Sequence, residues 1–340
     1  MRVLFDTYPW AFVAPGGGER QLLEYAKNLP GHGVEVVLHD HWNPTLDAVD
    51  AVHFFSCIGG SWHFCNYVRE RSLPLVISTS LWIEEETKHL YPSEEIRSQL
   101  LLADVIVTNS NAESEALATV FGLPRDLFVA VMNGIDPRFA GPHDSTLFQK
   151  TFNIGAPFIL NVANIERRKN QLNLVRALAG HDLPLVLLGH VREPAYAEQV
   201  LAEGEGRARY LGFLDHESPL LSSAYAACAA FVLPSTLETP GLAALEAAAA
   251  GAPVVVTRVG APREYFGGLC HYVDPADPSD IARGVDAALE QGPPAELSAH
   301  VVKNFTWARV TSVLPEIYRT ALARRDTRRG RFDACRLTEG

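Results

Sequence analysis

The chain has 340 residues, of which 47% are hydrophobic and 20% charged, and its formal net charge is −11. This composition excludes a disordered or fibrous protein, and at about 150 residues per domain the length predicts two domains. A broad nucleic-acid surface needs a positive field, so the negative charge argues against a nucleic-acid partner.

Neither the cysteines nor the apolar stretches indicate export or membrane insertion. Five cysteines without a CxxC pair give little support to a disulfide framework and favour a reducing compartment. The opening MRVLF runs into polar residues, unlike a signal peptide, and the most apolar stretch, 242–256, is broken by Glu246 and Gly251. We expect a cytoplasmic protein. Peripheral contact with the inner face of the membrane stays open, because arginines accumulate near the C-terminus.

Short β-branched runs alternate with helical patterns in the first part of the chain. This alternation predicts βαβ units around a parallel sheet. The expected strands are 2–5, 34–39, 51–55, 75–78, 105–108 and 128–132, and the expected helices are 19–29, 94–103 and 112–121. The loop HFFSCIGGSWH at 53–63 is open to two interpretations, an acceptor-facing loop or a packed core edge.

Gly, Pro and polar residues interrupt the pattern at 137–155, where we place a domain boundary. The alternation then restarts, which predicts a second doubly wound domain and a ligand in the cleft between the two, beyond the carboxyl ends of the strands. The expected strands are 158–162, 185–188, 208–211, 231–233, 254–257 and 271–273, and the expected helices are 171–178, 219–227, 241–250 and 279–290.

A glycine-rich segment, APGGGER at 14–20, precedes the first expected helix. Glycines ahead of a helix let the backbone approach an anion, and free N–H groups at the helix start favour phosphate. The spacing is not the GxGxxG of dinucleotide-binding proteins. A plain flexible turn is the alternative.

A second helix start follows the strand FVLPS. Thr239 is the expected N-cap and Pro240 the first helical residue, where a missing N–H costs least. The amides of Gly241 and Leu242 would then point out of the helix start, where a diphosphate could bind.

Two glutamates, Glu238 and Glu246, flank this helix start eight residues apart. If both were helical, one carboxylate would lie at the helix mouth and the other two turns inside. A carboxylate repels phosphate but accepts hydrogen bonds from hydroxyls, and paired ribose hydroxyls suit a bidentate carboxylate. A capping Glu238 and an ordinary ion-paired Glu246 are the alternative.

A third segment, NVANIERRKNQ at 161–171, leaves the first strand of the second domain with three consecutive cations. Arg167, Arg168 and Lys169 could neutralise a leaving diphosphate there. A solvated basic turn is the alternative.

In this order, the segments resemble the retaining nucleotide-sugar glycosyltransferases of the GT-B fold, specifically glycosyltransferase family 4. The family's Glu-x7-Glu element is present as Glu238 and Glu246. The resemblance covers about residues 1–325, and its best segments are GGGER, ADVIVTNSNAESEAL, VAVMNGIDPRF, NVANIERRKNQ, YLGFLDHESPLLSSAYAACAAFVLPS and ETPGLAALEAAAAGAPVVVTRVGAPREY.

The resemblance implies two Rossmann-like, doubly wound domains that face each other across a cleft. The acceptor-side domain would comprise 1–145 and the donor domain 146–310. A helix at 311–326 would cross back to the first domain, and a basic tail would occupy 327–340.

The resemblance also assigns roles to individual residues. Glu246 would hold the ribose hydroxyls, and Glu238 would contact the transferred sugar. The amides of Gly241 and Leu242 would bind the diphosphate, with Lys169 as the phosphate-binding lysine.

Four further residues complete the implied donor site. Gly17 and Gly18 would approach the diphosphate from the first domain. Phe213 and Leu214 would flank the base, which is left open among UDP, GDP, ADP and dTDP.

The chain departs from the family pattern within the donor site. Asn164 stands where the family has an arginine, and Arg167 and Arg168 are the candidates to replace it. Thr239 and Pro240 stand in place of the common Gly-Phe, so one backbone donor is missing.

A further departure falls on the catalytic residues, which the resemblance implies are Glu238, Lys169 and Ser80. Ser80 takes the place of a histidine that lies beside the reacting sugar. A serine keeps one hydrogen bond but cannot carry a positive charge.

The implied reaction is hexosyl-type transfer to a hydroxyl acceptor with retention of configuration, in carbohydrate biosynthesis. The departing phosphate would take the acceptor proton, so that catalysis rests on positioning and on stabilising the diphosphate. The donor is a co-substrate, and the acceptor is a sugar, a lipid-linked or a small molecule. A non-catalytic nucleotide-sugar binder and a GT-B sugar-nucleotide epimerase are the alternatives.

No cofactor and no metal are expected, because the chain contains no Asp-x-Asp element. His39 and His41 would share one face of a strand, but without a third ligand at suitable spacing they make a weak metal site.

Overall fold

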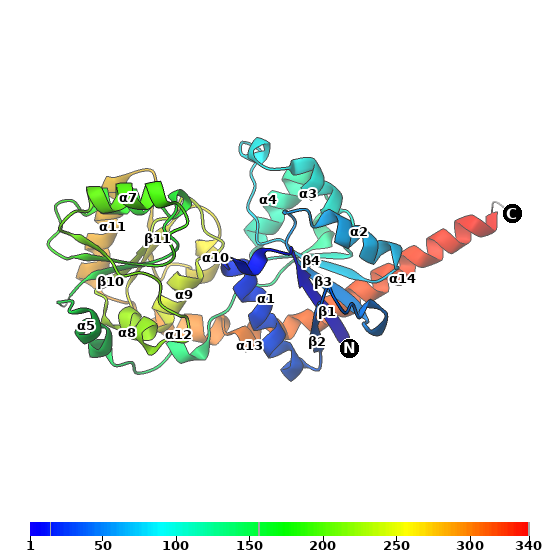
Figure 1. The fold of residues 1–340 in the computed structure, drawn as a ribbon, viewed down its shortest axis with the longest axis horizontal. Helices are drawn as coiled ribbons and strands as arrows, with labels where there is room; N and C mark the ends of the chain where they lie inside the picture. The colour runs from blue at the N-terminus through cyan, green and yellow to red at the C-terminus, as the bar shows by residue number, and fades with distance from the viewer. Residues whose placement is uncertain (14, 156, 339–340) are drawn as a thin grey trace. The chain divides into compact units, whose positions relative to one another are not determined.

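The computed structural model describes residues 1–13, 15–155 and 157–338, with side chains described up to Asp326. The chain forms two compact units. Unit 1 comprises Met1–Asn133 and the segment from Trp307 onward, and unit 2 comprises Gly134–Thr306. Each unit has one six-stranded parallel sheet with helices packed against it (Figure 1), which confirms the predicted α/β architecture.

The sheet of unit 1 has the strand order β2-β1-β3-β4-β5-β6. Its strands are β1 (Arg2–Thr7), β2 (Glu35–Leu38), β3 (Ala51–Phe55), β4 (Leu75–Ser78), β5 (Val105–Thr108) and β6 (Phe128–Ala130). Its α-helices are α1 (Gly17–Asn28), α2 (Trp62–Glu70), α3 (Ser93–Leu100), α4 (Asn111–Phe121), α13 (Trp307–Val310) and α14 (Leu314–Thr338).

The sheet of unit 2 has the strand order β12-β11-β10-β7-β8-β9. Its strands are β7 (Ile159–Val162), β8 (Leu185–Leu188), β9 (Ala208–Tyr210), β10 (Ala230–Leu233), β11 (Val254–Thr257) and β12 (His271–Val273). Its α-helices are α5 (Ser145–Phe152), α6 (Gln171–Ala177), α7 (Pro194–Glu203), α8 (Pro219–Ala227), α9 (Leu242–Ala249), α10 (Pro262–Phe266), α11 (Pro278–Gln291) and α12 (Ala295–Asn304).

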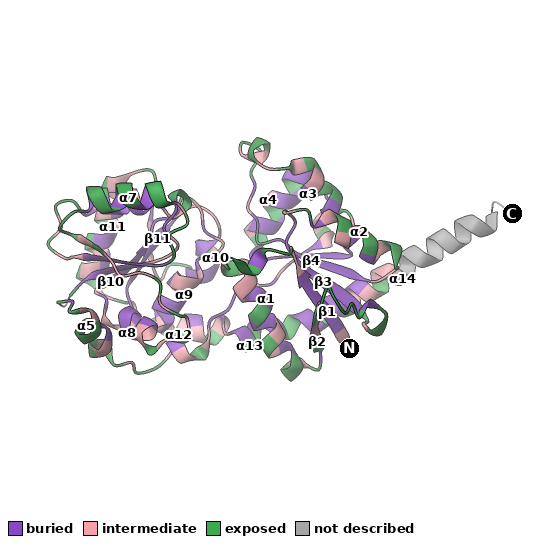
Figure 2. Ribbon diagram, viewed as in Figure 1, coloured by how far each residue is buried: buried purple, intermediate pink, exposed green. Residues whose placement is uncertain are grey.

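The central strands are buried on both faces, which explains their uninterrupted apolar sequences. Strands β4, β5, β8, β10 and β11 are buried at every residue. Figure 2 shows the strands as buried ribbon within each unit, whereas the helices carry exposed residues on their outer sides.

The chain enters unit 2 earlier than the sequence predicts, after Asn133, where the expected boundary is residue 145. The reason is helix α5, which lies in the segment interpreted as an interruption. Its Phe148 is fully buried, and the Phe148 amide donates to Ser223 Oγ of α8 at 2.9 Å, so that α5 is part of unit 2. The chain returns to unit 1 after Thr306.

Helix α14 belongs to unit 1 and packs against β3, β4 and β5. Tyr318 of this helix is buried, and its hydroxyl lies 2.9 Å from His53 Nδ1, so His53 is a core residue and does not line a loop. The expected helix 311–326 corresponds to the short 3-10 helix η8 (Thr311–Val313) and the start of α14. The side chains of the expected basic tail, 327–340, lie outside the described residues.

Within the described residues, no helix combines the length and the apolar character that a membrane span requires.

Candidate functional site

The candidate site of unit 2 lies where the order of its strands reverses. Strands β7 and β10 are neighbours at the centre of the sheet, and the chain continues from them toward opposite edges. Ligands of open parallel sheets bind at such a switch point, beyond the carboxyl ends of the strands. Lys169 follows β7 in the short helix η7 (Arg167–Lys169), and Glu238 follows β10.

Lys169 and Glu238 form a buried ion pair at this point. Lys169 Nζ lies 2.5 Å from Glu238 Oε1, and the same oxygen accepts a hydrogen bond from Ser235 Oγ at 2.6 Å. Only 13% of the Lys169 side chain and 5% of the Glu238 side chain are exposed. The structure therefore brings together Lys169 and Glu238, both predicted to bind the donor, as an ion pair.

The pKa values of the pair reflect burial and mutual attraction. Burial lowers the pKa of Lys169, and the charge of Glu238 opposes this shift. Burial alone would raise the pKa of Glu238, but the positive charges of Lys169 and Arg168 outweigh it and hold the pKa below its usual value. Glu238 is therefore an ionised carboxylate for which Lys169 supplies the counter-charge.

Asn170 fixes the loop that carries Lys169. This residue has a φ of 60°, and its side-chain Nδ2 donates to Pro234 O at 2.9 Å and to Pro275 O at 2.8 Å. The amide of Thr236 donates to Arg168 O at 2.9 Å. The loop after β7 is thus joined to the loops after β10 and β12, which holds the lysine at the strand ends.

Helix α9 begins later than the sequence predicts. Gly241, with a φ of 87°, is the N-cap, and Leu242 is the first helical residue. Thr239 is not the N-cap and Pro240 is not helical; a cis peptide joins the two ahead of the helix. The prediction was wrong because the cap adopts the αL conformation, which favours glycine, and a Cβ at this position would lie 2.8 Å from Leu233 Cδ2.

Glu238 lies against this helix start. A Cβ added to Gly241 would be 3.5 Å from Glu238 Oε2, which places the carboxylate beside the positive end of the helix. The Glu238 backbone is equally constrained, since a Cβ on Gly260 would lie 2.2 Å from Glu238 O. The Ala261 amide donates to that carbonyl at 2.9 Å.

Glu246 lies just over one turn inside α9 and not two, because the residues before Gly241 are not helical. Its Oε1 contacts His216 Nε2 at 2.8 Å, and its Oε2 accepts from the Tyr225 hydroxyl at 2.8 Å. The Glu246 side chain is 10% exposed. Burial and the Glu246 charge raise the pKa of Tyr225, so its hydroxyl stays a donor.

Arg138 fixes the tautomer of His216. One guanidinium nitrogen contacts His216 Nδ1, and another pairs with Glu217. A guanidinium only donates, so Nδ1 accepts, and the ring proton lies on Nε2, where it is donated to Glu246. Arg138 and His216 therefore orient the Glu246 carboxylate, whose remaining lone pairs can accept from a ligand's hydroxyls.

Two aromatic residues lie after strands β8 and β9, His190 after β8 and Phe213 after β9. Phe213 stacks on His190 with ring centroids 3.9 Å apart and an interplanar angle of 16°, and 51% of Phe213 is exposed. Leu214 beside it is half-buried. A flat, accessible ring of this kind can stack on a nucleobase.

Arg168 and Arg192 are both paired with the same acidic residue, Glu166. Arg168 Nη2 lies 3.0 Å from Glu166 Oε1, and Arg192 Nη1 lies 3.5 Å from Glu166 Oε2. When the side-chain oxygen and nitrogen of Asn164 are exchanged, the oxygen accepts from Arg192 Nε at 3.0 Å and from Arg192 Nη2 at 3.3 Å. Arg192 therefore brings a guanidinium to the position where Asn164 departs from the family pattern.

In unit 1 the predicted glycines are part of a helix. Gly17 and Gly18 are the first two residues of α1, and only Gly16 precedes it as the N-cap. The Gly16 amide donates to Glu19 Oε2 at 2.6 Å, so a carboxylate already caps this helix start. The expectation of a glycine loop ahead of the helix is thus corrected.

Ser80 lies close to Gly18, within 3.9 Å of a Cβ added there. It has a φ of 44° and is exposed. Its hydroxyl donates to Gln21 Oε1 at 3.1 Å and accepts from Asn109 Nδ2 at 3.2 Å. The structure thus brings Ser80 and Gly18 together in a neutral polar network.

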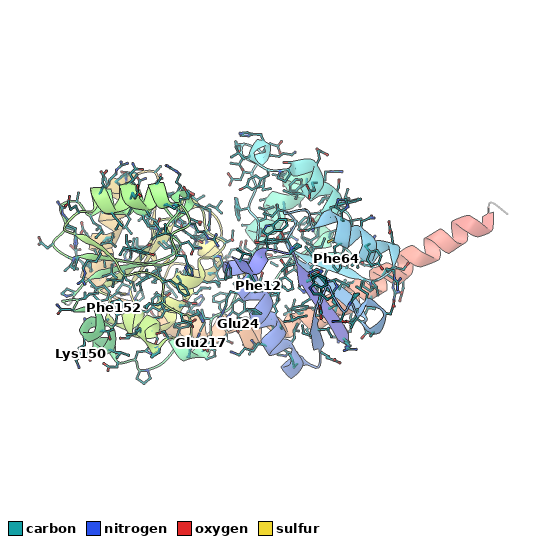
Figure 3. All side chains as sticks on the ribbon, in the orientation of Figure 1. Phe12, Glu24, Phe64, Lys150, Phe152 and Glu217 are labelled. Atoms are coloured by element: carbon teal, nitrogen blue, oxygen red, sulfur yellow. The ribbon has the colours of Figure 1, made fainter. Side chains whose placement is uncertain are left out.

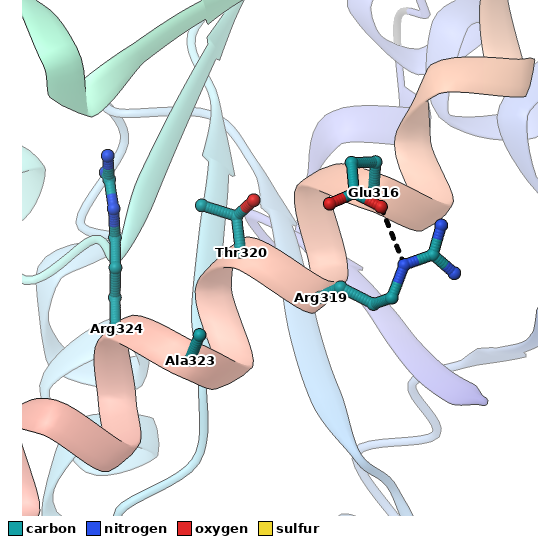
Figure 4. A pocket seen from close by; sticks show the side chains of 5 residues that line it. All are labelled: Glu316, Arg319, Thr320, Ala323 and Arg324. Atoms are coloured by element: carbon teal, nitrogen blue, oxygen red, sulfur yellow. Dashed lines mark hydrogen bonds and ion pairs between the residues drawn. The ribbon is translucent and has the colours of Figure 1, made fainter.

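Several site residues escaped the sequence analysis, namely Arg138, His190, Arg192, His216, Tyr225 and Ser235. Ser235 lies only three residues from its partner Glu238, but the partners of the others lie far away in sequence, as His216 and Tyr225 show at 30 and 21 residues from Glu246. A separate pocket runs along α14 in unit 1 (Figure 4), and none of the predicted site residues lines it; its lining residues are Glu316, Arg319, Thr320, Ala323 and Arg324.

Solved structures show that this is the GT-B fold. The Anabaena protein HepE, solved in complex with UDP and glucose, matches with a TM-score of 0.77 and 19% identity over 93% of this chain and 99% of its own. Sucrose-phosphate synthase from Thermosynechococcus elongatus matches with a TM-score of 0.80 and 18% identity over 95% and 99%.

Sequence comparisons agree with this class. Residues 144–305 match the family model described as glycosyl transferases group 1. A D-inositol 3-phosphate glycosyltransferase from Acidothermus cellulolyticus is 31% identical over 251 residues, or 66% of this chain. The chain spans 55% of that relative's length. Together the matches support a GT-B glycosyltransferase.

Proposed function

We propose that the protein is a retaining glycosyltransferase of family 4, which moves a hexosyl group from a nucleoside-diphosphate sugar to a hydroxyl acceptor. The observation that carries the proposal is the buried Lys169–Glu238 pair at the β7/β10 switch point, with Glu246 one turn inside the adjoining helix. HepE, which has the same fold, was solved with UDP and glucose, and this supports a nucleotide-sugar donor.

Unit 2 offers a partner for each part of such a donor. The carboxylate of Glu246, oriented by His216 and Tyr225, accepts from the ribose hydroxyls. The diphosphate binds at the start of α9, where the first amides have no intrahelical acceptor, and beside Lys169. Glu238, which is held by Lys169, then accepts from a hydroxyl of the transferred sugar.

The reaction requires no protein nucleophile. The acceptor oxygen bonds to the anomeric carbon while the bond from that carbon to the phosphate oxygen breaks, and the phosphate takes the acceptor proton. Lys169 and the helix start stabilise the charge that develops on the leaving diphosphate. Since these groups do the work that a divalent ion does elsewhere, transfer is independent of metal. The acceptor is a sugar, a lipid-linked or a small-molecule hydroxyl compound.

The proposal is tested by incubating the full chain with UDP-, GDP-, ADP- and dTDP-sugars and a panel of hydroxyl acceptors, with water as the default acceptor. NMR of the anomeric proton then gives the configuration of the product. We expect turnover of one donor class with retained configuration, equal in EDTA and in magnesium. An inverted product would contradict the mechanism, complete loss in EDTA with recovery in magnesium would contradict metal independence, and binding without turnover would indicate a non-catalytic binder.

A further inference from the structure

Three potential metal ligands converge at the carboxyl edge of the sheet in unit 1, outside the proposed donor-binding residues. Asp6 lies in β1, and His39 and His41 follow β2, the neighbouring strand. One ligand atom from each of the three side chains lies within 4.8 Å of the others. The sequence pattern indicates His39 and His41 as neighbours but not Asp6, because the aspartate is 33 residues away from His39.

The distances fit a single ion. Asp6 Oδ2 lies 2.8 Å from His39 Nδ1, and Asp6 Oδ1 lies 3.6 Å from His41 Nε2. Ligand atoms bound to one ion at about 2.1 Å are about 3.0 Å apart in octahedral and about 3.4 Å apart in tetrahedral geometry. The two oxygens of the Asp6 carboxylate thus each face one imidazole, and one ligand atom of every side chain lies within 4.8 Å of the others.

Two of the three ligands are fixed and one is accessible. The side chains of Asp6 and His39 are 6% and 5% exposed, whereas His41 is 52% exposed. The ring of Phe64, which is labelled in Figure 3, packs on His39 with ring centroids 5.0 Å apart. The site thus has a rigid floor, and an ion can enter from solvent past His41.

The second ring nitrogen of His39, Nε2, is buried and makes no hydrogen bond to the described residues. The His39 side chain as a whole is more than nine-tenths buried. Buried polar atoms are nearly always paired, so an exception calls for an explanation. An ion bound at Nδ1 would take the place of the hydrogen bond to Asp6, with the neutral ring in the tautomer that carries its proton on Nε2.

We propose that Asp6, His39 and His41 form a binding site for a divalent transition-metal ion of the zinc class. Two imidazoles and one carboxylate form a ligand set that suits zinc, cobalt or nickel and leaves at least one position for water or another ligand. The site stabilises unit 1 by tying β1 to the segment after β2, since an ion that binds only the folded state favours it.

The competing interpretation is a structural Asp6–His39 hydrogen bond, in which His41 has no part. His41 therefore carries the test, and its exposure makes His41→Ala a change that the fold tolerates. His63→Ala is the matched control, because His63 is also exposed, lies in the same unit and is outside the cluster.

The experiment titrates the EDTA-stripped full chain with Co²⁺, followed by its visible absorption, and then displaces cobalt with Zn²⁺. We expect one ion per chain in the wild type and in His63→Ala, and at least about tenfold weaker binding in His41→Ala, as is typical when a metal site loses a ligand or its support. Zn²⁺ should raise the melting temperature of the wild type but not that of His41→Ala.

Wild-type protein that binds no Co²⁺ at millimolar concentration would overturn the proposal, and so would equal affinity in His41→Ala and the wild type. Neither readout depends on sugar transfer, which proceeds without this ion, so failure here leaves the proposed function untouched.

Discussion

The two units share a parallel sheet of six strands, yet the carboxyl edges of their sheets carry different chemistry. In unit 2 the switch point holds the buried Lys169–Glu238 ion pair, and the Glu246 carboxylate lies just inside the adjoining helix. In unit 1 the Ser80 hydroxyl bonds to the neutral amides of Gln21 and Asn109, and the neighbouring Glu113 carboxylate is buried and accepts from Thr79 Oγ1. A fold does not determine a function, and the residues at the strand ends do. Lys169 and Glu246 of unit 2 suit a diphosphate and ribose, whereas the hydroxyl and amides of the Ser80 network suit an uncharged hydroxyl compound.

The contrast between the two units is tested most severely by removing the buried cation of unit 2, Lys169. We expect Lys169→Met to lower kcat/KM for transfer by about 10²–10³-fold, the usual cost of losing one charge-stabilising group. Lys150→Met is the control, since Lys150 is an exposed lysine of the same unit.

The variant also leaves Glu238 buried without its counter-charge, so its folding is checked by circular dichroism. Lys169→Met combined with Glu238→Gln should regain stability but not activity. Activity in Lys169→Met within about threefold of the control would show that the lysine does not act on the leaving group.

A second change tests how tightly unit 2 holds the Glu238 backbone. In Gly260→Ala the new Cβ would lie 2.2 Å from Glu238 O, at a φ of 97°. We expect the free energy of unfolding to fall by about 2–3 kcal/mol, measured by urea denaturation. Gly268→Ala, where a Cβ meets nothing within 4 Å, should unfold like the wild type. If both variants had the same urea midpoint, the backbone at Glu238 could move to make room for the new Cβ without loss of stability.

A third experiment probes the core of unit 1 through pH. Burial lowers the pKa of His53 to about 3, from about 6.5 in the unfolded chain. Between these values the unfolded state binds the extra proton, so stability falls as pH decreases, by about 1.4 kcal/mol per pH unit from this group. Urea unfolding at pH 7, 6 and 5 should show a shallower dependence of stability on pH in His53→Gln than in the wild type. Identical slopes would show that folding does not lower the pKa of His53.

The smallest effect on transfer is expected from a change in the hydrogen-bonded network around Ser80 in unit 1. Ser80→Ala removes two hydrogen bonds of an exposed hydroxyl, so transfer should fall only about 2- to 10-fold, with nucleotide affinity unchanged. Ser222→Ala, which removes an exposed serine of unit 2, is the control. A loss in Ser80→Ala comparable with that in Lys169→Met would mean that Ser80 contacts the reacting sugar directly.

The sheets were predictable because their strands are continuous apolar runs. VVVT at 254–257 is buried at every position and can be little else than a central strand. Helices α2 and α5 were missed since each begins among glycine, proline or polar residues that locally favour a loop. Their helical state depends on packing against the rest of the unit, which a local pattern does not contain.

The candidate site was predictable only where its residues are close in sequence. Glu238 and Glu246 belong to one motif, but the partners that orient them come from distant loops, as His216 does. The same holds for Asp6 and His39, which parallel strand pairing brings together. The start of α9 was misplaced because Thr239 and Pro240 fit a cap as well as Gly241 does, until the backbone conformation is known.

The central claim is that unit 2 binds a nucleoside diphosphate through Glu246, and calorimetric titration with UDP, GDP, ADP and dTDP tests it most directly. The account predicts that one of the four binds best and that Glu246→Gln weakens this binding by about 1–3 kcal/mol, because a charged hydrogen bond to ribose is lost. Glu203→Gln, which changes a half-exposed glutamate on α7, should bind like the wild type. Unchanged affinity in Glu246→Gln, or an equal loss in Glu203→Gln, would contradict the account.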